Sequence, residues 1–215
     1  MKGSRPLSED EEGQLFSAYT GRGATRDRCM HELCVGTGMR ISEACSIRVC
    51  DVVKNGKVVK TLHIRRRDTK GKSGGAHFKL HPNARQAIRA QVRFLWSHGY
   101  VSPECYLLKS LENKHGGRLT ASGAYLAIIA AAKRAGIPLE RIGTHSLRKT
   151  FAMRVELLAL EKLRDGAIIN PYEVLREMLR HDNLKSTYSY VVGNSNLVSE
   201  IIDSFPMRSF DYERQ

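Results

Sequence analysis

The chain has 215 residues, 41% of them hydrophobic, which is enough to bury a substantial core in one domain. It contains no apolar run long enough to span a bilayer and no secretory signal at its start, so we expect a cytoplasmic protein rather than a membrane or secreted one. Lys and Arg outnumber Asp and Glu by 35 to 22, a net charge of +13, and such an excess points to a polyanionic partner, usually nucleic acid.

Two helices are predicted near the start of the chain. Ser8-Glu9-Asp10-Glu11 has the pattern of a capping box, in which the Ser and Glu side chains satisfy free amides at a helix start. The helix that follows carries Tyr19 on its apolar face. A second helix is predicted from about Thr25 to Val35, where the turn Gly36-Thr37-Gly38 stops it.

Residues 57–80 have the strongest strand pattern in the chain. Aliphatic and β-branched residues precede a turn region from Gly71 to Gly75, and Phe78 and Leu80 follow it. This pattern predicts an antiparallel β-hairpin. Many basic residues lie on or near it, opposed only by Asp68; they include Lys57, Lys60, Arg65, Arg66, Arg67, Lys70 and Lys72.

Helices are predicted for most of the remaining chain. They cover Pro82 to Ser97, the segment from the capping residue Thr120 to Gly136, Thr144 to Leu158, and a stretch that starts at Asn170-Pro171. Short helical segments are expected around 186–191 and 196–205. The fold class is therefore mostly α with a small antiparallel β-sheet. The residues expected to face the core are Ile88, Val92, Leu95, Trp96, Tyr125, Ile128, Ile129, Ala132, Val174, Leu175, Met178 and Leu179.

The cysteines indicate neither a disulfide framework nor a zinc site. Their number is odd, and no two of them form a Cys-x-x-Cys pair. Reduced thiols in a core fit this pattern better, and we expect no metal. The five are Cys29, Cys34, Cys45, Cys50 and Cys105.

Two short segments pair residues suited to phosphate chemistry. Arg40 follows a glycine turn and precedes Glu43 by three residues, so the carboxylate can hold the guanidinium in place. His145 and Arg148 are also three apart and share one helix face, where they can grip two phosphate oxygens. Each pair alone is more typical of a surface ion pair or an ordinary polar helix face.

The combination of motifs, in order, resembles the tyrosine recombinase and integrase family. That family shows Thr-Gly-hydrophobic-Arg-x-x-Glu, a hairpin lysine, His-x-x-Arg, Leu-Gly-His and a tyrosine nine residues after the last histidine. The resemblance runs from about Leu7 to Ile202. The matching residues here are Arg40 with Glu43, Lys70, His145 with Arg148, His181 and Tyr190.

The resemblance implies cleavage of DNA through a 3′-phosphotyrosyl bond, without a cofactor. Tyr190 would attack the phosphodiester, and Arg40 and Arg148 would clamp its non-bridging oxygens, with Glu43 in support. Lys70 would protonate the leaving 5′-oxygen. His145 would assist proton transfer at the tyrosine, and His181 would hydrogen-bond the phosphate.

Two of these assignments have competitors within the sequence. Lys72 lies in the same hairpin turn as Lys70, although Thr69-Lys70-Gly71 matches the family's pattern better. Tyr188 competes with Tyr190 for the role of nucleophile, and the spacing from His181 favours Tyr190.

The sequence also departs from the family pattern. Arg180 stands where the family has glycine, Lys149 stands where many relatives have histidine, and the stretch 160–170 is longer than usual. Residues 1–6 are expected to be a flexible start and 7–195 the catalytic domain, without a core-binding domain before them. The chain is then either a fragment or a naturally short member of the family, like the fimbrial invertases. Residues 196–215 are expected to form a segment that protomers exchange; the alternative is that this segment packs on its own domain. DNA contacts are expected from Arg65, Arg66, Arg67, Lys72, Lys149 and Arg180.

The resemblance implies double-stranded DNA as partner, and a homotetramer on synapsed DNA with a possible accessory DNA-bending or recombinase protein. A bacterial, phage or mobile-element origin is expected. Two alternatives use similar residues or the same fold: a type IB topoisomerase, and a DNA-binding regulator that has lost the chemistry. A general RNA-binding module is disfavoured because aromatic residues make up only 7% of the chain.

Overall fold

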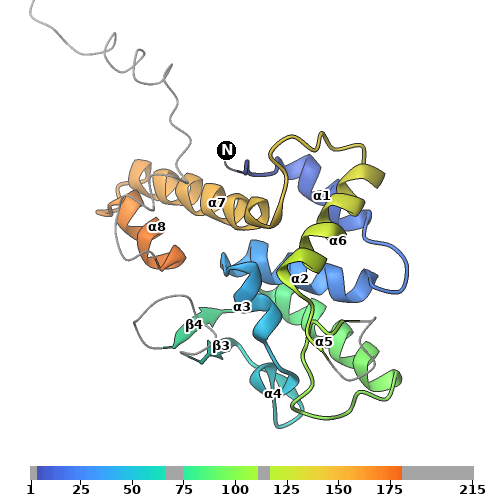
Figure 1. The fold of residues 1–215 in the computed structure, drawn as a ribbon. Coiled ribbons are helices and arrows are strands. Elements are labelled where there is room, and N and C mark those ends of the chain that lie inside the picture. The colour runs from blue at the N-terminus through green and yellow to red at the C-terminus, as the bar shows by residue number, and fades with distance from the viewer. Residues whose placement is uncertain (1–3, 66–74, 111–116, 181–215) are drawn as a thin grey trace, which may run out of the picture.

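The structure, a computed structural model, describes residues 4–65, 75–110 and 117–180. These ranges are mostly helical, as predicted (Figure 1). None of the described helices is long and apolar enough to cross a membrane. The helices are α1 (Glu9–Ser17), α2 (Ala24–Thr37), α3 (Ile41–Ser46), α4 (Val49–Val52), α5 (Pro82–Ser97), α6 (Ala121–Arg134), α7 (Thr144–Arg164) and α8 (Pro171–Leu179). The strands are β1 (Val53–Lys54), β2 (Lys57–Val58), β3 (Thr61–Ile64) and β4 (Ala76–Lys79).

The first helix begins with the predicted capping box. The Glu11 N–H donates to Ser8 Oγ at 3.2 Å, and the Ser8 N–H donates to Glu11 Oε2 at 3.0 Å. Arg5 binds the same carboxylate, with Nη2 2.6 Å from Oε1. Tyr19 is buried as expected, but it lies just beyond the end of α1.

The β-structure is divided between two separate two-stranded antiparallel sheets in the described residues. β3 pairs with β4, so that Leu62 lies opposite Phe78 as the predicted hairpin requires. Val58 instead pairs with Val53 in the β1–β2 sheet. Asn55 and Gly56 both take positive φ angles, 49° and 72°, and close a separate tight turn between those strands.

The later helices begin where the sequence predicts. α5 has the predicted bounds, and Thr120 caps α6 by accepting the Gly123 N–H at 3.0 Å. α7 continues past the predicted end at Leu158 to Arg164, and Gly166 with φ 90° follows. The longer stretch between α7 and α8 is therefore partly an extended helix end.

Three residues expected to face the core are exposed instead, and that prediction was wrong for them. Each lies next in sequence to a fully buried residue of its helix, and neighbouring residues are rotated by about 100° around a helix axis. They therefore emerge at the edge of the apolar face rather than at its centre. The exposed residues are Trp96 at 46%, Tyr125 at 45% and Met178 at 46%, beside Leu95, Ala124 and Leu179 respectively.

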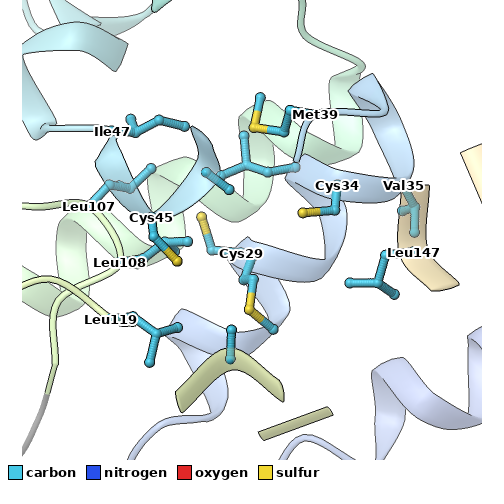
Figure 2. Packing of buried hydrophobic residues seen from close by; sticks show 14 of the residues in the cluster. Cys29, Cys34, Val35, Met39, Cys45, Ile47, Leu107, Leu108, Leu119 and Leu147 are labelled. Carbon is cyan, nitrogen blue, oxygen red and sulfur yellow. The ribbon is translucent and has the colours of Figure 1, made fainter. Parts of the chain in front are cut away.

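The core lies around α2, which packs against α3, α5, α6 and α7. Figure 2 shows Cys29 and Cys34 of α2 and Cys45 of α3 within this core, near Met39 and Leu108. All five cysteines are free, and these three are buried. Burial raises the pKa of the Cys45 thiol to about 11 and also raises the pKa values of Cys29 and Cys34. They therefore stay protonated and act as small hydrophobic packing groups.

Candidate active site

A pocket of about 150 Å³ lies between α3 and the first turn of α7. Arg40, His145 and Arg148 all line it, together with residues of the same two segments. The two arginine motifs come from opposite halves of the sequence, so the fold is what brings them together. The complete lining is Arg40, Ile41, Ser42, Thr144, His145 and Arg148.

Gly38 forms the turn that carries Arg40 to this pocket. It ends α2 with φ 66°, a left-handed conformation that glycine adopts without the steric cost of a side chain. A Cβ at this position would also overlap the ring of Phe151 on α7. The glycine therefore allows α2 to end in a left-handed turn, and it allows the α2–α3 turn to approach α7 closely.

Arg40 is the residue that caps α3, and Glu43 completes the cap. The Arg40 N–H donates to Glu43 Oε2 at 2.7 Å, and Arg40 Nη1 lies 3.4 Å from Glu43 Oε1. The Glu43 side chain is fully buried, whereas that of Arg40 is 24% exposed. The carboxylate thus fixes the backbone from which the Arg40 guanidinium reaches the pocket.

Arg148 is 2% exposed, and its guanidinium connects two distant segments. Its Nη1 donates to the carbonyl oxygen of Gly38, and its Nη2 donates to that of Leu179 at 2.7 Å. One side chain of α7 thereby joins the α2–α3 turn to the end of α8. These bonds hold a permanent positive charge in one orientation before any ligand arrives.

His145 is an exposed residue in the first turn of α7. The helix begins after Gly143, whose N–H donates to Ser146 Oγ at 3.1 Å. The N–H groups in the first turn of a helix point toward its N-terminal end, and that end carries the positive part of the helix dipole. Together with the two guanidinium groups, it makes the pocket favourable for an anion such as a phosphate.

Three residues expected to contact DNA lie outside this pocket. Arg65 is exposed, with Nη2 3.6 Å from Asp51 Oδ1. Lys149 is half-buried on α7, where burial and then the charge of Arg141 lower its pKa. Arg180 caps the end of α8, and its Nη2 donates to Glu43 Oε1 at 2.8 Å.

The remaining residues singled out in the sequence lie outside the described residues. They include the nucleophile candidates, both lysine candidates and the C-terminal segment 196–215. Their roles stay predictions. They are Arg66, Arg67, Lys70, Lys72, His181, Tyr188 and Tyr190.

Sequence reasoning missed a second basic concavity, a groove of about 430 Å³ between α5 and the β1–β2 turn. Three arginines spaced four residues apart share one face of α5, a signal that the sequence does carry. No carboxylate lines the groove among the described residues. We call this surface the basic groove; its cationic residues are Lys57, Lys60, Arg85, Arg89 and Arg93.

Comparison with known proteins places these features in a family. The model of the phage integrase family matches residues 5–196 of the chain. Tyrosine recombinase XerC of Bacillus subtilis (strain 168) is 28% identical over 213 residues, which cover 95% of this chain and 62% of the relative.

Solved structures share the fold. The crystal structure of XerA recombinase matches with a TM-score of 0.67 at 22% identity, covering 96% of this chain and 66% of that one. XerH site-specific recombinase, crystallised with its difH substrate as a pre-cleavage complex, matches with a TM-score of 0.64 at 21% identity, covering 95% of this chain and 55% of that one. The chain therefore spans less than two thirds of the length of each of these proteins.

Proposed function

The chain belongs to the phage integrase family, and we propose that residues 7–195 are the catalytic domain of a tyrosine-type site-specific recombinase. This domain cleaves and rejoins double-stranded DNA through a 3′-phosphotyrosyl intermediate. The observation that carries the proposal is the pocket in which Arg40, His145 and Arg148 meet.

The pocket supplies the charge stabilisation that phosphoryl transfer requires. Negative charge builds on the non-bridging oxygens as the phosphorus becomes pentacovalent. Arg148 is held by the Gly38 and Leu179 carbonyls, and Arg40 projects from a cap that Glu43 fixes. Both guanidinium groups can therefore meet this charge with little reorganisation, and such preorganised donors are each worth about 10²–10³ in rate.

The remaining chemistry is assigned by the resemblance alone. Tyr190 is the nucleophile, Lys70 the general acid for the 5′-oxygen, His145 the group that assists proton transfer at the tyrosine, and His181 a phosphate ligand. The phosphotyrosyl bond conserves the energy of the broken phosphodiester, so the cycle needs no nucleotide and no metal.

DNA is the partner that fits the charge and the relatives. The chain carries a net charge of +13, and XerH was crystallised with its difH substrate. The basic groove offers a second place for the DNA backbone. We expect a tetramer on synapsed DNA in a bacterial cytoplasm, with the segment 196–215 exchanged between protomers and an accessory protein where the site requires one.

A type IB topoisomerase would also use arginines, a histidine, a lysine and a tyrosine. The Thr37-Gly38-Met39-Arg40 turn and the Leu-x-His element favour the recombinase. The two functions differ in product, because only a recombinase joins strands from two different duplexes.

Trapping on a nicked suicide substrate tests the proposal, with pooled genomic duplexes as the substrate while the site is unknown. The expected result is a DNA-shifted protein band on a denaturing gel, present in wild type and Tyr188→Phe and lost in Tyr190→Phe. Intact DNA binding without any covalent band would contradict the proposal and favour the regulator.

A further inference from the structure

Arg180 occupies a backbone position that disfavours arginine. It ends α8 with φ 54° and ψ 52°, in the left-handed region where a side chain clashes with the backbone and glycine is preferred. The structure thus gives a reason for the glycine that the family carries here. The strain of this conformation is offset by the bonds of the Arg180 backbone N–H to the Arg176 and Glu177 carbonyls and by the side-chain contacts of Arg180.

The first of these contacts is with Glu43, a carboxylate that is 0% exposed. Arg180 Nη2 lies 2.8 Å from Glu43 Oε1, whereas Arg40 Nη1 lies 3.4 Å from the same oxygen. Arg180 is therefore the closer cation, although Arg40 is the neighbour in sequence. Burying a carboxylate this completely is costly unless a cation pairs with it.

The second contact is with Phe78 on β4. The Arg180 guanidinium carbon lies 4.3 Å from the centroid of the Phe78 ring, within the range of a cation–π interaction. The Arg180 side chain thus joins the end of α8 to α3 and to the β3–β4 hairpin. Its side chain is 27% exposed, so most of its surface is buried against the protein.

We propose that Arg180 is a positioning residue, which neutralises Glu43 and holds the end of α8 and strand β4 against α3. Because Arg180 is the closer cation to Glu43, Arg40 shares only its Nη1 with that carboxylate, at 3.4 Å, and the rest of its guanidinium remains available for the scissile phosphate. This inference rests on the proposed function, and it replaces the expectation that Arg180 binds DNA directly. The two roles predict different measurements.

The experiment compares Arg180→Gln, Glu43→Gln and the double variant with wild type. Arg176→Gln is the matched control, because Arg176 lies one turn earlier on α8 and pairs only with Glu173 of that helix among the described residues. DNA affinity is measured against salt concentration, and the cleavage rate is measured at saturating DNA. Urea unfolding midpoints are measured for all variants.

A positioning role predicts that Arg180→Gln cleaves saturating DNA about 10- to 100-fold more slowly, because displaced catalytic groups cost this much. The salt dependence of binding should stay at the wild-type value. The effects of Arg180→Gln and Glu43→Gln should not add, since each removes the same pair. Arg180→Lys should recover part of the rate, and Arg180→Gly should not, although glycine relieves the backbone. Arg176→Gln should behave as wild type.

A direct phosphate contact would instead lower the salt slope by about 0.9 and weaken binding while cleavage at saturation stays unchanged. That result would overturn the proposal, as would additive effects of the two single variants. If wild type forms no covalent product, the proposed recombinase function fails. The pair is then tested by the unfolding midpoints, where additivity again overturns it and non-additivity supports it.

Discussion

Gly38 lies against the ring of Phe151, in a left-handed conformation with φ 66°. This contact sets how closely the turn that bears Arg40 approaches the helix that bears His145 and Arg148. The glycine is thus a structural part of the candidate site, although it offers no chemical group to a substrate.

Gly38→Ala should destabilise the protein by about 2 to 4 kcal/mol, the sum of left-handed strain and overpacking against Phe151. It should also reduce cleavage, because Arg40 is displaced from the pocket. Urea unfolding and suicide-substrate cleavage measure the two effects. Gly21→Ala is the control, since Gly21 has φ 76° but a Cβ added there would meet no atom within 4 Å. A Gly38→Ala loss no larger than the control's would show that the Phe151 contact is unimportant.

The two pocket arginines should differ in their effect on stability. Arg148→Ala leaves the buried carbonyls of Gly38 and Leu179 without their donors. It should therefore lower the free energy of unfolding by about 3 to 5 kcal/mol and also abolish cleavage. Arg40→Ala should abolish cleavage with a smaller loss of stability, because its side chain is partly exposed. Thermal unfolding and covalent trapping compare them. Equal losses of stability would contradict the structural role given to Arg148.

The basic groove should contribute to DNA affinity through phosphate contacts. Arg89→Gln combined with Arg93→Gln should lower the slope of log affinity against log salt by about 2, at about 0.9 per phosphate. The control is Lys162→Gln with Arg164→Gln at the far end of α7, which removes the same charge. Fluorescence anisotropy over a salt series measures both. Equal slopes for the two double variants would exclude the groove as a specific contact surface.

Glu12 should make stability depend on pH in the acid range. Burial alone would raise the pKa of its carboxyl, but the hydrogen bond with His31 and the charge of Arg154 lower it below its ordinary value. Arg154 Nη2 lies 2.5 Å from Glu12 Oε2. Because the pKa of Glu12 is lower in the native state, the unfolded chain binds more protons in the acid range. The stability that ionised Glu12 contributes is therefore fully present above the ordinary carboxyl pKa of about 4.3. It is lost as the pH falls through the native pKa of Glu12.

Glu12→Gln should therefore make the free energy of unfolding depend less on pH in the acid range. It should also lower that free energy by about 1 to 3 kcal/mol near neutral pH. Glu9→Gln on the exposed side of the same helix should keep most of the neutral-pH stability. Urea titrations at a series of pH values measure this dependence. An unchanged pH dependence of Glu12→Gln in the acid range would contradict the assignment.

Much of the helical framework follows from local signals in the sequence. Ser8 with Glu11, Thr120, and Pro82 mark helix starts that the structure confirms. The β1–β2 sheet was missed, although Asn55-Gly56 is a typical two-residue hairpin turn, because the strands beside it are only two residues long. Exposure of Trp96 also needed the structure, since helical spacing alone does not define the edge of a buried face.

The candidate site is predictable in part. Motif spacing singles out Arg40, His145 and Arg148, and the structure places all three around one pocket. The contact between Glu43 and Arg180 joins residues that are 137 positions apart in the chain. Nothing in the local pattern of either segment indicates it, because such a pair depends on how α8 packs against the rest of the molecule.

The proposed function requires that the pocket serve a tyrosine that attacks DNA. Mass spectrometry of the covalent product, after protease and nuclease digestion, identifies both the modified residue and the linkage. We expect a nucleotide joined through its 3′-phosphate to Tyr190. A nucleotide on another residue, a 5′ linkage, or no adduct while the protein still binds the substrate would contradict the proposed function.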